Sequence, residues 1–362
     1  MGLFYALEKI TIKIFDTIND LPENWNAVAA ENHFLQLPYL KVLELSAPTN
    51  MQCFYIGYYE NATLIGVSLA QYLDLNKLES FGERDNCFKT YIRNFIFRNF
   101  ASHTLFIGNN MITGQNSFIF NKEISFEDVS HVLMQSSQEL VKYFKQKGIK
   151  IHLVSFKDFY QDCATAFKNH AFAKVYEFNT QPNMVFELPS NWLTAEDYYN
   201  SFSKKYRDQY IENELYHHVA KNAPFNTFFL AENHFSTFKR QCGNGFRIFG
   251  YFLNDKLIGF HSVLLNDTVL ETYFLGYDDQ VQKENMLYLN MLYNMTEFGI
   301  THQFKKIIFG RTALEIKSSI GATPVMMSGF IYHRMLLVNK FLGKIFKNLE
   351  PETVWHQRHP FK

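Results

Sequence analysis

Apolar and polar positions along this chain follow strand-like and helix-like periods in turn, and one succession of them occurs twice. Residues 57–66 read Gly-Tyr-Tyr-Glu-Asn-Ala-Thr-Leu-Ile-Gly, and residues 250–259 read Gly-Tyr-Phe-Leu-Asn-Asp-Lys-Leu-Ile-Gly. An apolar run precedes and follows each copy. Because Asn and Asp tolerate the backbone of tight turns, each copy predicts a β-hairpin that turns at Asn61 or Asn254. The shared spacing favours internal duplication over coincidence.

Downstream of each hairpin, the apolar residues change to helical spacing and then form a short continuous run. In the first half, the helical pattern starts at Ser125, and residues 151–156 read as a strand. In the second half, residues 282–298 carry the helical pattern up to Gly299, and residues 306–310 read as a strand. The order strand, hairpin, helix, strand predicts an α/β (α+β) fold with mixed sheets, one in each half.

The boundary between the halves is predicted where prolines and asparagines cluster, in residues 180–191. We therefore expect an N-terminal domain of residues 1–182 and a C-terminal domain of residues 183–362. The second domain is expected to carry the active site. The first half contains an additional stretch, roughly residues 74–120, which we expect to form a lid or an elaborated sheet edge.

The composition is that of a globular protein long enough for two hydrophobic cores. The chain has 362 residues, of which 47% are hydrophobic and 19% are charged. Aromatic residues make up 17%, including 38 Phe and 21 Tyr. This excess fits either an aromatic-rich core or an apolar groove that admits a long acyl chain.

The charge balance and the cysteines exclude several classes of protein. Lys plus Arg and Asp plus Glu both number 35, which argues against a general nucleic-acid binder, although a local basic patch stays open. The four cysteines are scattered and predict reduced thiols rather than a disulfide framework or a zinc site. The start does not read as a signal peptide, and no apolar run approaches the roughly 20 residues of a membrane span. We expect a soluble cytoplasmic protein, with peripheral membrane contact left open.

The most specific stretch of the sequence is residues 308–324, where charged and hydroxyl residues directly follow a predicted strand. Thr312 is predicted to cap a helix whose first N–H groups hold a phosphate or carboxylate. Arg311, Glu315 and Lys317 add two cations and a base. The spacing of four places Arg311 and Glu315 on one helical face. A solvated helix start with a Glu-Lys pair is the alternative interpretation.

This stretch resembles a block in bacterial proteins of the GNAT superfamily, on the Fem-type (FemAB-like) branch, whose members pair two GNAT-like domains in one chain. Other blocks fit in the same order: residues 34–40, 202–207, 275–278, 285–289 and 355–362. Together they cover most of the second half and touch the first. The chain departs from ordinary acetyltransferases because neither hairpin is followed by a Gln/Arg-x-x-Gly-x-Gly/Ala loop for the CoA pyrophosphate.

The resemblance implies transfer of an acyl group to an amine by direct attack. The donor is an acyl thioester, either acyl-CoA or acyl carrier protein, which serves as co-substrate; no bound cofactor is implied. In this scheme Glu315 accepts the amine proton or orients Arg311, which holds an anion or the oxyanion. His261 is an alternative base, and Tyr277 is a candidate to protonate the leaving thiolate. The alternative is that both are structural residues of the sheet.

Substrate-binding roles are assigned to the remaining polar residues of the resembling blocks. Lys204 and Arg207 form a basic cluster suited to the phosphates of the donor, or are simply solvated. Lys317, Thr312 and Arg358 join them as substrate-binding candidates. His217, His218, His356 and His359 lack a carboxylate partner at ligand spacing, so we expect no metal site.

Two other functions stay open beside the thioester-dependent enzyme. The first is a Fem-type transferase that takes its acyl group from aminoacyl-tRNA and acts on a peptidoglycan precursor; the zero net charge speaks against it. The second is a non-catalytic double-GNAT protein that binds a lipid or a partner, which would explain the missing pyrophosphate loop.

Overall fold

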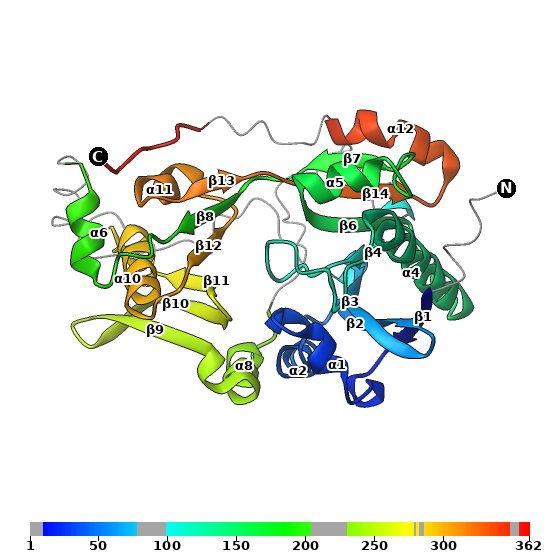
Figure 1. Cartoon of the computed structure of the whole chain (residues 1–362), viewed down its shortest axis with the longest axis horizontal. Coiled ribbons are helices and arrows are strands. Elements are labelled where there is room, and N and C mark those ends of the chain that lie inside the picture. The colour runs from blue at the N-terminus through cyan, green and yellow to red at the C-terminus, as the bar shows by residue number, and fades with distance from the viewer. Residues whose placement is uncertain (1–9, 78–98, 204–229, 279, 282–285, 348–354) are drawn as a thin grey trace. The chain divides into compact units, whose positions relative to one another are not determined.

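The computed structural model describes residues 10–77, 99–203, 230–278, 280–281, 286–347 and 355–362 (Figure 1). They fall into two compact units. The first comprises the described residues within Met1–Thr180, Thr227–Gln241 and Met327–Pro351. The second comprises those within Gln181–Asn226, Cys242–Met326 and Glu352–Lys362. The predicted boundary after residue 182 lies near the first crossing between units, but two later segments return to the first unit. A division of the chain into sequential domains at residue 182 stays a prediction.

The first unit is built on an eight-stranded sheet with the order β1-β2-β3-β4-β6-β14-β7, in which β5 also pairs with β3. Its strands are β1 (Ile10–Phe15), β2 (Met51–Glu60), β3 (Thr63–Asp74), β4 (His103–Ile107), β5 (Phe118–Phe120), β6 (Leu153–Tyr160), β7 (Tyr176–Asn179) and β14 (Met327–His333). Strands β4 and β6 are parallel, and the other pairs are antiparallel. The sheet is therefore mixed, as predicted.

The helices of the first unit bury one apolar face each. They are α1 (Trp25–Ala29), α2 (Leu37–Leu45), α4 (Phe126–Gln146), α5 (Gln161–Lys168), α12 (Leu336–Lys347) and most of α8 (His234–Cys242). Ser125 caps α4 as predicted, because its Oγ accepts the N–H of Asp128 at 3.0 Å. The core contains many fully buried rings, Phe54, Phe144 and Phe156 among them, so much of the aromatic excess is core packing. None of the described helices has the length and apolar character needed to cross a bilayer.

The second unit repeats this architecture with fewer strands. Its six-stranded sheet has the order β13-β8-β12-β11-β10-β9. The strands are β8 (Asn183–Glu187), β9 (Phe246–Leu253), β10 (Lys256–Asn266), β11 (Val269–Tyr277), β12 (Lys306–Gly310) and β13 (Thr323–Val325). Its helices are α6 (Ala195–Ser201), α10 (Leu287–Thr301) and α11 (Leu314–Ser319). Strands β11 and β12 are the parallel pair of this sheet.

The two predicted hairpins are confirmed as β2–β3 and β9–β10, and they agree in detail. Asn61 and Asn254 begin their two-residue turns with φ of 48° and 49°. Each return strand also carries one extra residue at the same place, Ile65 in β3 and Ile258 in β10, where the register shifts by one. A shared turn and a shared bulge support the duplication that the sequence predicts.

Two local predictions need correction. The additional stretch of the first half is not an elaborated edge, because its described part supplies β4, an interior strand between β3 and β6. The alternative, a lid, concerns residues 78–98, which lie outside the described chain, and stays a prediction. The helical pattern of the second half does not end at Gly299, since α10 continues to Thr301. A Cβ on Gly299 would lie 2.7 Å from Cδ1 of Ile307, so this glycine lets the helix approach β12 closely.

Candidate functional site

The parallel pair of the second unit stops pairing well before its longer strand ends. Val269, Leu270 and Glu271 of β11 pair with residues 306–308 of β12. Strand β11 then continues for six residues to Tyr277, where its ladder partner among the described strands is β10 alone. One edge of this half of β11 therefore has no ladder partner within the described chain. A ligand that carries amides can bind beside a strand where its ladder with the neighbouring strand ends.

Glu271 lies at the point where the pairing stops. It pairs with Ile308 across the parallel ladder and with Leu264 of β10 on its other side. Its side chain is 5% exposed, and burial raises its pKa from 4.5 to about 8. Asn266 and Lys306 moderate this rise. A carboxyl group with a pKa near neutrality, at the end of the parallel ladder, has the properties of a general base.

The loop from β12 to α11 has an irregular backbone, and this overturns two expectations. Gly310, Thr312 and Ala313 all have positive φ, at 69°, 68° and 46°. Ala313 rather than Thr312 is the residue that caps α11, and no side chain caps it. Because two left-handed residues separate Arg311 from the helix, Arg311 and Glu315 do not share a helical face as their spacing predicted. Arg311 itself is half-buried and directly follows β12, at the carboxyl end of the parallel pair.

Lys317 points into this loop rather than toward solvent. Its side chain is 3% exposed, and its Nζ donates to the carbonyl oxygens of Gly310 at 3.2 Å and of Arg311 at 2.6 Å. Burial lowers the pKa of Lys317 from 10.5 to about 7. The amine therefore holds the backbone of the loop in place, which positions Arg311.

Glu315 and Arg358 contact each other, although the sequence pattern did not pair them. The Arg358 guanidinium donates to Oε1 of Glu315, and both side chains are partly exposed, at 37% and 47%. The Arg358 backbone N–H also donates to Oγ of Ser318, at 2.9 Å. The C-terminal residues are thereby fastened along α11, and Phe361 stacks on Phe186 and Phe202.

Neither a protein-family model nor a curated protein sequence matches the chain. Among solved structures, FemX is similar with a TM-score of 0.53 at 10% identity, over 93% of this chain and 99% of that one. The chain has a Fem-type double-GNAT fold. Weaker likenesses include a tandem GNAT protein from the clavulanic acid biosynthesis pathway (TM-score 0.46, 9% identity, 90% of this chain and 98% of that one). They also include L-PGS from Bacillus licheniformis (TM-score 0.37, 12% identity, 85% and 94%).

Within this double-GNAT fold, His261 belongs to a hydrogen-bond network between the sheet and α10. The Tyr251 hydroxyl donates to Oδ1 of Asn294 at 2.6 Å and lies 2.9 Å from Nδ1 of His261. Since the hydroxyl has a single hydrogen, it accepts from Nδ1–H of His261. The ring is 1% exposed and stacks on Phe249. Burial lowers the pKa of His261 to about 3, so it is a weak base at neutral pH.

The first unit has the same network at equivalent positions, with serine in place of histidine. Tyr58 and Tyr251 each follow the first glycine of their hairpin, and Ser68 and His261 each stand two residues after the second. The Tyr58 hydroxyl lies 2.8 Å from Oγ of Ser68 and 3.2 Å from Oγ of Ser136 on α4. In the first unit a serine takes the place of the histidine, and the network still connects the hairpin to the helix. An imidazole is therefore not required for this connection.

The other candidates lie apart from Glu271 or outside the described chain. Tyr277 pairs with Gly259 and packs in the core cluster that contains α10, on the face of the sheet that His261 shares. Glu271 pairs with Leu264, which stands an odd number of positions after Gly259 and His261 along β10. Because side chains alternate between the two faces of a sheet, Glu271 faces the side opposite to Tyr277 and His261. Lys204 and Arg207 lie outside the described residues.

The sequence pattern did not predict Glu271 as a residue of the candidate site. Its sequence signal is slight: one acidic residue inside the aromatic run of residues 269–277. An ionisable residue within an otherwise apolar central strand is the feature that could have identified it, since such residues are rarely buried without a role.

Proposed function

We propose that this chain is an N-acyltransferase that moves an acyl group from a phosphopantetheine thioester to an amine at the parallel strand pair of its second unit. The observation that carries the proposal is the early end of the β11–β12 ladder at Glu271. A phosphopantetheine arm has two amides in an extended chain. Beyond Glu271, β11 continues for six residues past its ladder with β12, and the arm is proposed to lie along this stretch as an added strand does.

The chemistry proposed for Glu271 is removal of the proton from the attacking amine. The amine nitrogen attacks the thioester carbonyl carbon, a C–N bond forms, and the C–S bond breaks as the thiolate leaves. Glu271 takes the proton that the nitrogen loses. Its pKa of about 8 suits this step, because a stronger acid would be a poor base and a weaker one would stay protonated. Positioning of the two substrates supplies much of the remaining acceleration.

Arg311 is proposed to hold an anionic group of the donor. It stands at the carboxyl end of β12, which is where ligands of parallel strands bind, and Lys317 fixes the backbone beneath it. Acyl-CoA and acyl carrier protein share the phosphopantetheine arm, so the strand edge fits both. The absence of the pyrophosphate loop from the sequence favours acyl carrier protein.

The direct test is thiol release from a panel of acyl-CoA and acyl carrier protein thioesters in the presence of a broad panel of amines. Release that depends on both the amine and Glu271 is the expected result. Transfer from aminoacyl-tRNA alone would replace the donor and keep the class of reaction. No transfer from any donor would refute the enzymatic proposal.

A further inference from the structure

Helix α12 of the first unit exposes a row of large apolar side chains. Leu336, Leu337 and Phe341 are 86%, 75% and 51% exposed. At 100° per residue, these three and the exposed Lys340 and Lys344 fall within one arc of about 140°. We call these five residues the outer face of α12. Full exposure of two adjacent leucines is costly in water, so this face is built to be covered.

The opposite side of α12 already has its partners in the same unit. Leu342 is 3% exposed, and Gly343 lies against Tyr176 of β7, where a Cβ would come within 3.1 Å of the ring. Oδ1 of Asn339 accepts the backbone N–H of His333, which fixes the start of the helix to β14. The helix is thus held on the sheet by one side, as Figure 1 shows, and its outer face is a fixed surface.

The charged residues of the segment that forms α12 all have one sign. Residues 334–347 contain Arg334, Lys340, Lys344 and Lys347 and no Asp or Glu, in a chain whose net charge is zero. Two of these lysines stand among the exposed apolar residues rather than around them. Lysine is depleted from protein–protein interfaces, whereas apolar residues interleaved with lysines are typical of helices that lie in the surface of an anionic membrane.

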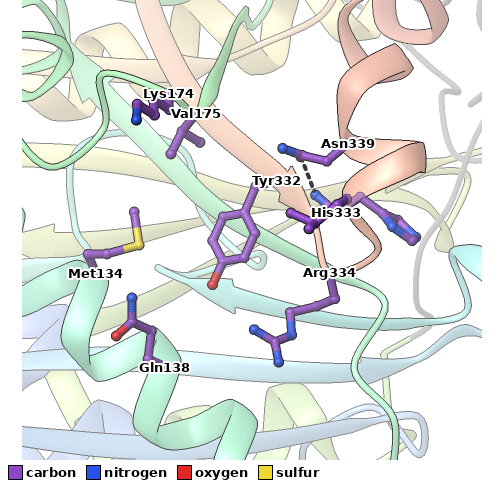
Figure 2. Close-up of a pocket in the computed structure, with 9 residues that line it drawn as sticks. Met134, Gln138, Lys174, Val175, Tyr332, His333, Arg334 and Asn339 are labelled. Atoms are coloured by element: carbon purple, nitrogen blue, oxygen red, sulfur yellow. Dashed lines mark hydrogen bonds between the residues drawn. The ribbon is translucent and has the colours of Figure 1, made fainter.

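A cavity of about 320 Å³ adjoins the first turn of α12 and has the same charge character (Figure 2). Its lining residues are Met134, Gln138, Lys174, Val175, Tyr332, His333, Arg334, Leu336 and Asn339. They include two cations, Lys174 and Arg334, and no carboxylate. Leu336 belongs both to this cavity and to the outer face. The acyl chains of an anionic lipid whose headgroup occupied the cavity would therefore lie against the apolar side chains of α12.

We propose that the first unit docks on a membrane surface containing anionic phospholipid through the outer face of α12. Leu336, Leu337 and Phe341 enter the boundary between headgroups and acyl chains. Lys340 and Lys344 extend to lipid phosphates, with their apolar stems along the same boundary. The cavity between Lys174 and Arg334 accepts the phosphate of one lipid. This docking is independent of the acyl-transfer proposal and would hold for a non-catalytic protein as well.

The test is co-sedimentation of the full chain with vesicles of equal parts phosphatidylglycerol and phosphatidylcholine, compared with pure phosphatidylcholine. We expect binding to the anionic vesicles that weakens with added salt. Leu336→Asp combined with Leu337→Asp should abolish it. Lys340→Gln combined with Lys344→Gln should lower the partition coefficient roughly tenfold or more on anionic vesicles only. Arg334→Gln should have a smaller effect of the same kind.

A matched control comes from the β9–β10 hairpin of the second unit. Phe252 and Leu257 are 64% and 55% exposed, and Phe252→Asp with Leu257→Asp should bind vesicles as the wild type does. All variants change exposed residues, so unchanged thermal unfolding confirms that each is folded. Equal sedimentation with both kinds of vesicle, or none with either, would refute the proposal. A lipid-free dimer that Leu337→Asp converts to monomer would also refute it, because the face would then bind a second copy.

Discussion

The two units differ in where the ladder between their parallel strands ends. In the second unit the β11–β12 ladder stops at Glu271, and β11 runs on with one edge lacking a ladder partner among the described strands. In the first unit the β4–β6 ladder runs from Thr104 to Ile107, which is the last residue of β4. In the first unit it is therefore β4 that ends with the ladder, and β6 that continues beyond it to Tyr160.

The loop that follows β4 occupies the space beside the rest of β6. Lys157 Nζ donates to the Asn109 carbonyl at 3.1 Å, and Ser117 Oγ donates to the Lys157 carbonyl at 3.0 Å. Further along β6, the Tyr160 N–H donates to Oε1 of Gln115 at 2.9 Å. The first unit thus closes with its own chain the position that we propose a donor fills in the second.

The equivalent of Glu271 in the first unit is a phenylalanine. Gln71 and Leu264 each stand five residues after the second glycine of their hairpin, and their cross-strand partners are Phe106 and Glu271. The duplication kept the turn, the bulge and the tyrosine network, all of which serve the fold. The two units differ in the ionisable residue and in where the parallel ladder ends, and this difference is the reason for proposing the chemistry in the second unit.

The largest expected effect is that of Glu271→Gln on turnover. Loss of the base should lower kcat at least about hundredfold. In the wild type, kcat/KM should rise with pH and level off above about 8, because Glu271 must lose its proton first. The variant should lack this rise. Gln115→Ala, in the loop that closes the first unit, is the control and should leave turnover unchanged.

Glu271→Gln also has a signature in stability that needs no substrate. The pKa of Glu271 is raised from 4.5 to about 8 in the folded chain, so the folded state holds an extra proton between these values. The contribution of Glu271 to the free energy of unfolding should fall as pH rises from about 4.5 to about 8, so the stability of the wild type relative to the variant should decrease over this range. Equal pH dependence in chemical denaturation would contradict the burial of this carboxyl.

Lys317→Met should be the most destabilising of the site variants. It leaves the carbonyls of Gly310 and Arg311 without their donor, at a cost of about 3 kcal/mol. Because the pKa of Lys317 is lowered from 10.5 to about 7, wild-type stability should gain a contribution that grows as pH rises through this window. Chemical denaturation should then show a larger gap between wild type and variant at pH about 9.5 than at pH about 7. An unchanged gap would mean that the amine is solvated.

His261→Ser introduces the residue of the first unit into the second and tests whether the two networks are equivalent. The serine hydroxyl can keep a bond to Tyr251, while the lost ring volume should lower the free energy of unfolding by about 2 kcal/mol. Turnover should stay within a few-fold of wild type. A loss as large as that of Glu271→Gln, at unchanged stability, would make His261 the base.

The repeated hairpins and the helix starts could be predicted from the sequence because the signals that specify them lie within a few neighbouring residues. Asn61 and Asn254 specify their turns through backbone preferences of two residues, and Ser125 specifies a helix start in the same way. The candidate site depends instead on how residues that are distant in the sequence pair in the sheet. Strand β11 continues beyond its ladder with β12, so that Glu271 lies at the end of the ladder. This depends on residues that pair across a sequence separation of 37 positions, as Glu271 and Ile308 do.

The residues of the 308–324 block show the same limit. The block was recognised as distinctive, and the structure does place it at the end of a parallel strand. The helical spacing of Arg311 and Glu315 misled because Thr312 and Ala313 take a left-handed backbone, which their residue types do not favour. Arg358, the partner of Glu315, is 43 residues away along the chain, beyond any local pattern.

The smallest effect is expected for Glu315→Gln, although the sequence makes Glu315 a candidate base. Its carboxylate is 47% exposed and contacts Arg358, which is 37% exposed, so water screens the pair on both sides. Exposed pairs of this kind contribute less than about 1 kcal/mol, and turnover should be unaffected. A double-mutant cycle with Arg358→Gln should give a coupling energy within that limit and a melting temperature lowered by a degree or two at most. If Glu315→Gln instead abolished turnover while Glu271→Gln did not, the base would lie on α11. The early end of the β11–β12 ladder would then be a feature of the fold alone.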